Sequence, residues 1–130
     1  MKQYKSTKCY LSIDCRTTLN PTLFVGRVIY KIRQNVPVTE QTFFVLDKSV
    51  LEVSKENKNI FWEDVFKNNA IKTVETNLKG TVGIEDLKAG IYYICGVRRT
   101  HFETRVWNVR IDLKPGENCL VLDDNNGAEI

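Results

Sequence analysis

The chain of 130 residues has one histidine, one methionine, four cysteines and no long apolar run. A single histidine excludes a site with two histidine ligands, and neither the GxSxG motif nor the phosphate-binding GxxxxGKS/T motif occurs. The longest apolar run, Ile91 to Cys95, is far shorter than the roughly 20 residues of a membrane helix and is too short for a secretory signal. We therefore expect a soluble chain without a transmembrane segment, and we assign no catalytic residue, cofactor or metal.

Charge and length place the chain in an ordinary globular class. Nineteen lysines and arginines face sixteen acidic residues, so the formal net charge of +3 gives no broad attractive field for nucleic acid. A chain of this length buries roughly two thirds of its unfolded surface and needs neither metal nor a dense disulfide framework. The sequence therefore predicts one domain over residues 1–130 and no nucleic-acid partner.

The cysteines lack the spacing of a metal site, because no CxxC motif is present. Cys9 and Cys15 are six residues apart in a predicted strand, hence about 20 Å, which excludes a disulfide between them. Both alternate with polar residues together with Leu11 and Ile13. This pattern favours buried thiols, and other pairings that involve Cys95 or Cys119 stay open as the alternative.

Period-two alternation dominates the first half of the chain and predicts strands. The segment Cys9 to Cys15 reads as a half-buried strand, and Phe24 to Arg33, after the break at Asn20-Pro21, reads as a second one. Gln41 to Leu46 contains four consecutive apolar residues and predicts a strand covered on both faces. A further short strand is expected at Val50 to Val53.

One segment departs from this pattern. Phe61 and Val65, and likewise Trp62 and Phe66, are four residues apart and would share helical faces. We therefore predict one short helical insert near residues 60–67.

The C-terminal half predicts strands separated by tight turns. Val74 to Asn77 and Thr81 to Ile84 flank a turn at residues 78–80, and residues 88–90 form the turn that precedes a strand at Ile91 to Val97. Alternation from Trp107 to Leu113 predicts the next strand. Pro115-Gly116 then fits the centre of a type II turn, before a last strand at residues 119–122.

Two segments resemble carboxypeptidase regulatory-like, prealbumin-like (transthyretin-like) domains. Val74 to Ile94, with its spacing of Gly80, Leu87 and Gly90, is similar to the central motif of that family, and Ile111 to Leu122 is similar to its final hairpin. The resemblance implies an all-β fold, a seven- to eight-stranded antiparallel Greek-key β-sandwich. The residue types of the motif are consistent with this fold, because Gly80 and Gly90 suit tight turns and Leu87 suits the core.

The resemblance also carries functional expectations. Domains of this kind act as accessory, adhesive or structural modules, relatives include glycan-binding modules, and an extracytoplasmic or cell-surface location is slightly favoured. This chain departs from the family pattern at Asn77, where aspartate is frequent, and in the helical segment at residues 59–68.

A basic loop between two predicted strands is one candidate binding site. Arg98, Arg99, His101 and Arg105 concentrate positive charge there, with Phe102 beside them. The structural interpretation is a solvated hairpin tip, and the functional one is a patch for an anion or an acidic partner. The functional interpretation predicts that exchanging Arg98 and Arg99 for glutamate abolishes binding and leaves the fold intact.

Aromatic residues are the other candidates. Trp62 and Phe102 would stack against a sugar ring if they are exposed. Trp107 begins an apolar alternation, which favours core packing. Neighbouring carboxylates such as Asp123 and Asp124 point to opposite faces of a strand or lie in solvent, and they lack the spacing of a calcium loop.

The sequence thus favours a non-enzymatic binding, adhesion or assembly module with a protein or glycan partner. A carbohydrate-binding module that uses exposed aromatic residues is the first alternative. A small enzyme or enzyme-modulating domain around residues 98–105 is the second. Homodimerisation through an edge strand is a further expectation, because an open sandwich leaves strand edges unpaired.

Overall fold

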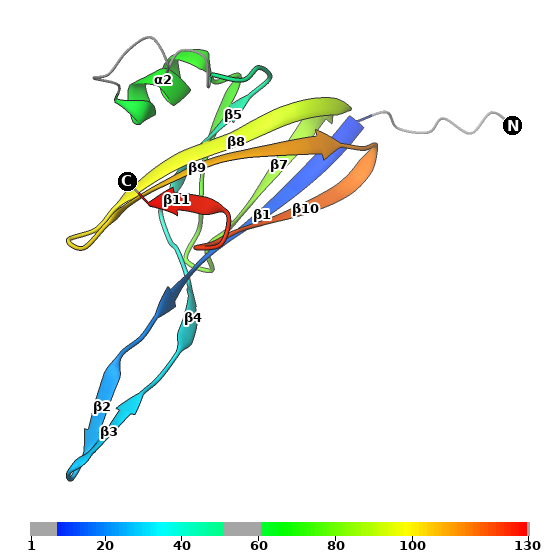
Figure 1. Ribbon diagram of the computed structural model, residues 1–130. Coiled ribbons are helices and arrows are strands. Elements are labelled where there is room, and N and C mark those ends of the chain that lie inside the picture. Colours follow the sequence, from blue (N-terminus) through cyan, green and yellow to red (C-terminus); the bar gives the residue numbers. More distant parts are fainter. Residues whose placement is uncertain (1–7, 51–60, 130) are drawn as a thin grey trace, which may run out of the picture.

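The computed structural model describes residues 8–50 and 61–129, and the fold is mainly β with one short helix (Figure 1). The described residues form eleven strands: β1 Lys8–Leu19, β2 Thr22–Val25, β3 Val28–Lys31, β4 Gln34–Pro37, β5 Thr42–Leu46, β6 Lys72–Glu75, β7 Thr81–Lys88, β8 Gly90–Arg99, β9 Thr104–Leu113, β10 Gly116–Leu122 and β11 Gly127–Glu129. The helix α2 spans Trp62–Asn69. No helix within these two ranges is long and apolar enough to cross a membrane.

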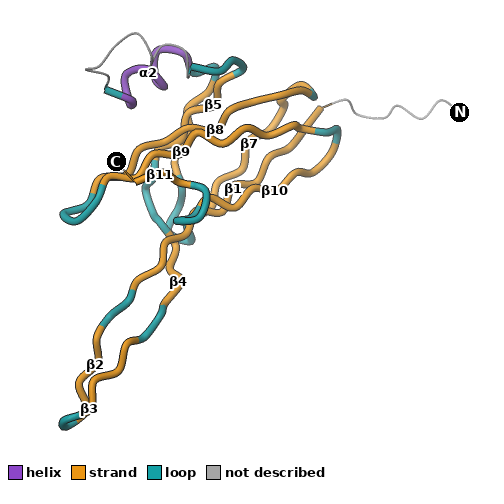
Figure 2. The backbone as a smooth tube through the Cα atoms, in the orientation of Figure 1, coloured by secondary structure: helices purple, strands orange, loops and turns teal. Residues whose placement is uncertain are grey.

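The strands form two sheets and a separate ribbon (Figure 2). In one sheet β1 lies between β10 and β7, and β4 pairs with the C-terminal part of β1. The other sheet has the order β11-β9-β8-β5-β6, and β2 pairs with β3 alone. The expectation of a purely antiparallel fold is wrong at one place, because β10 crosses over from β9 and runs parallel to β1.

The main core lies between the two sheets. Inward residues of β1 alternate with outward ones, so that Leu11, Ile13 and Cys15 are fully buried, as the sequence predicts. Phe43 and Trp107 face them from the other sheet and contact each other edge to face, with ring centroids 5.6 Å apart. The interpretation of Trp107 as a core residue is confirmed.

A second core lies on the other face of the five-stranded sheet, where α2 packs (Figure 1). Phe66 of α2 is fully buried against Phe44, Leu46 and Val50. This helix explains why β5 is apolar on both faces. The predicted helical insert and the doubly covered strand are confirmed. Val50 is buried outside any strand, and the rest of the strand predicted at residues 50–53 lies outside the described residues.

The predicted single strand from Phe24 to Arg33 is wrong. It is a hairpin, in which Gly26 and Arg27 form a two-residue turn between β2 and β3. Gly26 holds φ at 61°, as the first central position of a type II′ turn requires. Apolar residues flank the turn on both sides, so the sequence reads as one alternating run. Because this predicted strand is two strands, and because β4 and β11 are additional, the number of strands is higher than the expected seven or eight.

Candidate functional site

A two-stranded ribbon projects from the sandwich (Figure 1). Pairing of β1 with β4 matches Thr18 to Asn35, and pairing of β2 with β3 matches Thr22 to Lys31. The residue numbers of two opposed residues add up to the same value in the β1–β4 pairing and in the β2–β3 pairing. A single register therefore runs along the whole ribbon. We call residues 19–33 of this ribbon the arm.

The arm is apolar and exposed. Eight of its large hydrophobic residues have between 37% and 68% of their surface accessible: Leu19, Leu23, Phe24, Val25, Val28, Ile29, Tyr30 and Ile32. Single exposed apolar residues are normal on a protein surface, whereas a contiguous group of this size marks an interaction site. The arm is therefore the strongest candidate binding surface among the described residues.

The two faces of the arm differ. Along β1 the odd-numbered residues point into the core, and this alternation continues through Leu19, Leu23 and Val25. Opposite them in the ribbon lie Val28 and Tyr30. We call this side the core-side face, because it extends the inward surface of the sheet beyond the sandwich. It is apolar along its length.

The opposite side, the back face, is mixed. Phe24 and Ile29 form a cross-strand pair near the tip, and Thr22 pairs with Lys31 closer to the base. All charges of the arm are positive, because Arg27, Lys31 and Arg33 lie in a stretch from residue 17 to residue 39 that contains no acidic residue. The arm is thus a cationic apolar element.

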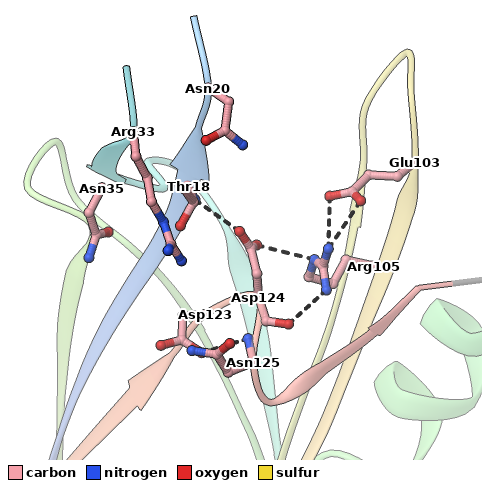
Figure 3. Close-up of a pocket in the computed structure, with 9 residues that line it drawn as sticks. All are labelled: Thr18, Asn20, Arg33, Asn35, Glu103, Arg105, Asp123, Asp124 and Asn125. Carbon is pink, nitrogen blue, oxygen red and sulfur yellow. Dashed lines mark hydrogen bonds and ion pairs between the residues drawn. The ribbon is translucent and has the colours of Figure 1, made fainter. Parts of the chain in front are cut away.

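A polar cleft of about 820 Å³ lies at the base of the arm (Figure 3). Loops from three places meet there, at the base of the arm, between β8 and β9, and between β10 and β11. Its lining consists of Thr18, Asn20, Arg33, Asn35, Glu103, Arg105, Asp123, Asp124 and Asn125. Two arginines and three carboxylates give this lining a formal charge of 2 − 3 = −1.

Arg105 of β9 lines this cleft and is itself buried. Its guanidinium contacts Glu103 at 3.0 Å and Asp124 at 3.3 Å, and it donates hydrogen bonds to the backbone carbonyls of Asp124 and Gly127. Its Nε lies at ion-pair distance from Asp124 but is not aligned for a hydrogen bond. Arg105 therefore holds the loop between β10 and β11 in place.

Two charged groups of the cleft remain without an opposite charge among the described residues. The carboxylate of Asp123 accepts a hydrogen bond from the backbone N–H of Asn125 at 2.9 Å and forms no ion pair. The guanidinium of Arg33 on the arm also forms none, and it points into the cleft (Figure 3). Asp124 differs from Asp123, because its carboxylate already accepts hydrogen bonds from Thr17 and Thr18.

The structure does not gather the residues of the basic loop into one patch. Arg105 turns inward, and Arg99 forms an ion pair with Glu63 of α2. Arg98 is half-buried, and its position opposes Arg105 in the β8–β9 pair. His101 is exposed, and Phe102 is 97% exposed at the tip of that hairpin.

Trp62 begins α2, whereas Phe102 lies between β8 and β9. The Trp62 ring is half-buried against Phe66 of the same helix, with centroids 5.6 Å apart. Neither aromatic residue lines the polar cleft. Neither ring therefore adds a stacking surface to that cleft.

The thiols form no disulfide. Cys9, Cys15 and Cys95 are buried, and Cys119 on β10 is exposed. Loss of solvent raises the pKa of Cys15 to about 12, although the nearby Arg98 opposes the rise. Burial also raises the pKa of Cys95 to about 12. The buried thiols are therefore poor nucleophiles at neutral pH. Residues 8–50 and 61–129 contain no cluster of three or more metal-binding side chains.

Sequence reasoning missed the arm and the cleft. The signal for the arm was the Gly26-Arg27 turn inside an apolar alternation, with no acidic residue nearby. No local signal marks the cleft, because its residues come from distant segments. Comparison of the chain with protein-family models, with curated proteins and with solved structures finds no match.

Proposed function

We propose that this protein is a non-enzymatic binding and assembly module that engages a protein partner through the arm. Its scaffold is, in this proposal, a prealbumin-like sandwich with Greek-key connections. The observation that carries the proposal is the exposure of eight large hydrophobic residues on one projecting hairpin. Such a patch typically serves as an interaction surface.

The physical state of an isolated hairpin supports this proposal. A two-stranded hairpin with exposed apolar faces is at best marginally stable in water. A partner that covers the arm would remove this apolar surface from water and would order the ribbon further. The arm therefore gains stability on binding.

A protein fits the arm better than a lipid bilayer does. Both outer edges of the β2–β3 ribbon carry backbone N–H and C=O groups that no other described strand pairs. These groups cannot be left without hydrogen bonds in hydrocarbon, whereas a protein can supply partners for them. Arg27 at the tip also opposes insertion into lipid. The expected partner surface is apolar and bordered by carboxylates.

The experiment replaces Tyr30 of the arm with photo-reactive p-benzoylphenylalanine in cells that make the protein naturally. Phe102 is the matched control, since it is another exposed aromatic residue on a hairpin. The proposal expects crosslinks from position 30 to one protein at mapped residues and none to that protein from position 102. A position-30 variant that also carries Leu23→Thr should lose most of them.

Three outcomes would contradict this proposal. Crosslinks from position 30 to lipid would show a membrane-binding arm. Crosslinks from position 102 alone, to protein or glycan, would move the function to the loop between β8 and β9. A lack of crosslinks from both positions would remove the arm as a binding surface.

A further inference from the structure

We infer that the polar cleft at the base of the arm binds a short peptide whose amino and carboxyl ends are both free. The ammonium group of this peptide contacts Asp123, its carboxylate contacts Arg33, and its peptide groups contact the neutral side chains of the cleft. The inference adds a second binding site to the protein and does not depend on which protein the arm engages.

The cleft has two walls that come from distant parts of the chain (Figure 3). One wall is the back face of the ribbon near its base. Thr18 and Asn35 are opposed there in the β1–β4 pairing. The same register opposes Asn20 to Arg33, so these four residues share one face. The other wall is the loop between β10 and β11, which contributes Asp123. A ligand in the cleft therefore lies between the arm and the body.

Three of the nine lining residues are already bonded to one another. Arg105 contacts the carboxylates of Glu103 and Asp124. Asp124 also accepts hydrogen bonds from the hydroxyl of Thr17 and from the backbone N–H of Thr18. Arg105 is only 8% exposed. This group thus gives the cleft a fixed part, and its charges are satisfied within the protein.

The other six lining residues keep free hydrogen-bonding groups. The carboxylate of Asp123 accepts one hydrogen bond, from the backbone N–H of Asn125, and forms no ion pair with any described residue. Five further side chains form neither a hydrogen bond nor an ion pair within residues 8–50 and 61–129: Thr18, Asn20, Arg33, Asn35 and Asn125. These free groups decide which ligand the cleft can bind.

The two free charges are of opposite sign and lie on opposite walls, with Arg33 on the arm and Asp123 on the loop (Figure 3). An anion at Arg33 would be repelled by Asp123, and a cation at Asp123 would be repelled by Arg33. A neutral sugar would leave both charges unpaired. A ligand with a carboxylate at one end and an ammonium group at the other gains a charge-assisted contact at each. The charges therefore select a zwitterion.

The neutral free groups select what lies between the two ends of the ligand. Each of the three asparagine amides has N–H donors and a carbonyl acceptor, and the hydroxyl of Thr18 both donates and accepts. A peptide group likewise offers one donor and one acceptor. None of the nine lining residues is apolar, so side chains of the peptide gain little from the cleft. We therefore expect recognition of the two ends and the backbone. The volume of about 820 Å³ is within the range of small-molecule clefts.

The test is a titration of the isotope-labelled chain with triglycine, followed by two-dimensional NMR of the amide groups. Triglycine has both free ends and no side chain. A ligand of this size should have a dissociation constant of about 1 mM, so the titration extends to about 20 mM. The expected result is a saturable shift of the side-chain amide signals of Asn20, Asn35 and Asn125. The amide signal of Asn69 on α2, outside the cleft, is the control and should not move.

Capped peptides test the two charges separately. N-acetyl-triglycine lacks the ammonium group and triglycine amide lacks the carboxylate, and each should raise the dissociation constant at least about tenfold. Arg33→Gln should raise the constant for triglycine by a similar factor. In that variant triglycine amide should bind as well as triglycine, because the partner of the carboxylate is already gone.

Asp123→Asn should also weaken triglycine at least about tenfold, while its amide oxygen still accepts the bond from Asn125. Two matched controls should stay within about twofold of the unmodified chain. Lys31→Gln removes the neighbouring cation of the back face, and Asp47→Asn removes an exposed carboxylate outside the cleft.

The inference fails on any of three results. The first is the lack of saturable shifts at the cleft up to the highest peptide concentration. The second is equal affinity for triglycine and a capped peptide, which would show that the free charges do not select the ligand. The third is an unchanged cost of removing the carboxylate in Arg33→Gln, which would place the carboxylate on another cation. None of these results affects the crosslinks expected from position 30, so the proposed function is tested independently.

Discussion

The body of the sandwich and the arm share one alternating strand pattern, but their apolar side chains differ in burial. In the body, Leu11 and Ile13 of β1 are fully buried, whereas Leu23 on the same alternation is half exposed. The side chains are equally apolar, and only the layer opposite them differs. Alternation therefore decides which face of a strand is apolar, and the neighbouring layer decides whether that face becomes core or interface.

The largest expected effect is on folding stability, and it separates a buried aromatic residue from an exposed one. Trp107→Ala should lower the free energy of unfolding by about 3–5 kcal/mol, because it empties a fully buried site between the sheets. Phe102→Ala removes an aromatic ring that is 97% exposed and should change it by less than about 0.5 kcal/mol. Urea denaturation measures both. Equal losses would show that the body is not the main source of stability.

The next largest expected effect on stability comes from the buried ion pairs of Arg105. Arg105→Met should cost about 2–3 kcal/mol, because it leaves Glu103 and Asp124 without their cation while both keep some contact with solvent. Arg99→Met breaks a solvent-exposed pair with Glu63 and should cost about 0–1 kcal/mol. Denaturation at low and high salt compares them. If the exposed pair proved as costly as the buried one, the structural role given to Arg105 would be wrong.

The buried thiols predict a dependence on alkaline pH. Folding raises the pKa of Cys15 and Cys95 to about 12, so the folded state holds protons that the unfolded state has already released. The stabilisation by each protonated thiol is fully present below about pH 9. As pH rises from there toward 12, each thiol lowers the free energy of unfolding by up to about 1.4 kcal/mol per pH unit. Cys95→Ala should reduce this slope in alkaline urea titrations. An unchanged slope would exclude this thiol as its source.

The smallest expected effect concerns the arm. Leu23→Thr with Tyr30→Thr should alter the unfolding free energy of the dilute monomer by less than about 0.5 kcal/mol, since neither side chain belongs to a core. Thermal denaturation at low micromolar concentration checks this. A loss comparable to that of Trp107→Ala would mean that the arm is part of the folded body.

Much of the body could be predicted from sequence. Strict alternation in β1 and β9 identified strands and their inward residues, and two pairs of aromatic and apolar residues four positions apart identified α2. Turn residues located the chain reversals near Gly80 and Gly116, where φ is 75° and 98°. Neither reversal is a hairpin, because β6 and β7, like β9 and β10, belong to different sheets, so the expected final hairpin is wrong. These features depend on neighbours along the chain, so local physics is sufficient to find them.

The candidate site could be predicted only in part. Arg105 was assigned to a basic binding loop, although its alternation with Trp107 places both on the inward side of β9. Its role depends on Asp124, which is nineteen positions away in sequence and meets it only in the fold. The parallel pairing of β1 with β10 depends in the same way on a crossover between sheets.

The sequence by itself determined most strands of the body, the short helix and the apolar side of those strands, because side-chain direction follows from the backbone period. Only the tertiary structure decided which apolar faces are covered. The opposite sheet covers the inward face of β1 up to Cys15, and no layer formed by residues 8–50 and 61–129 covers the arm beyond it. Burial depends on which segments lie close together in space, and this is set only when the whole chain folds.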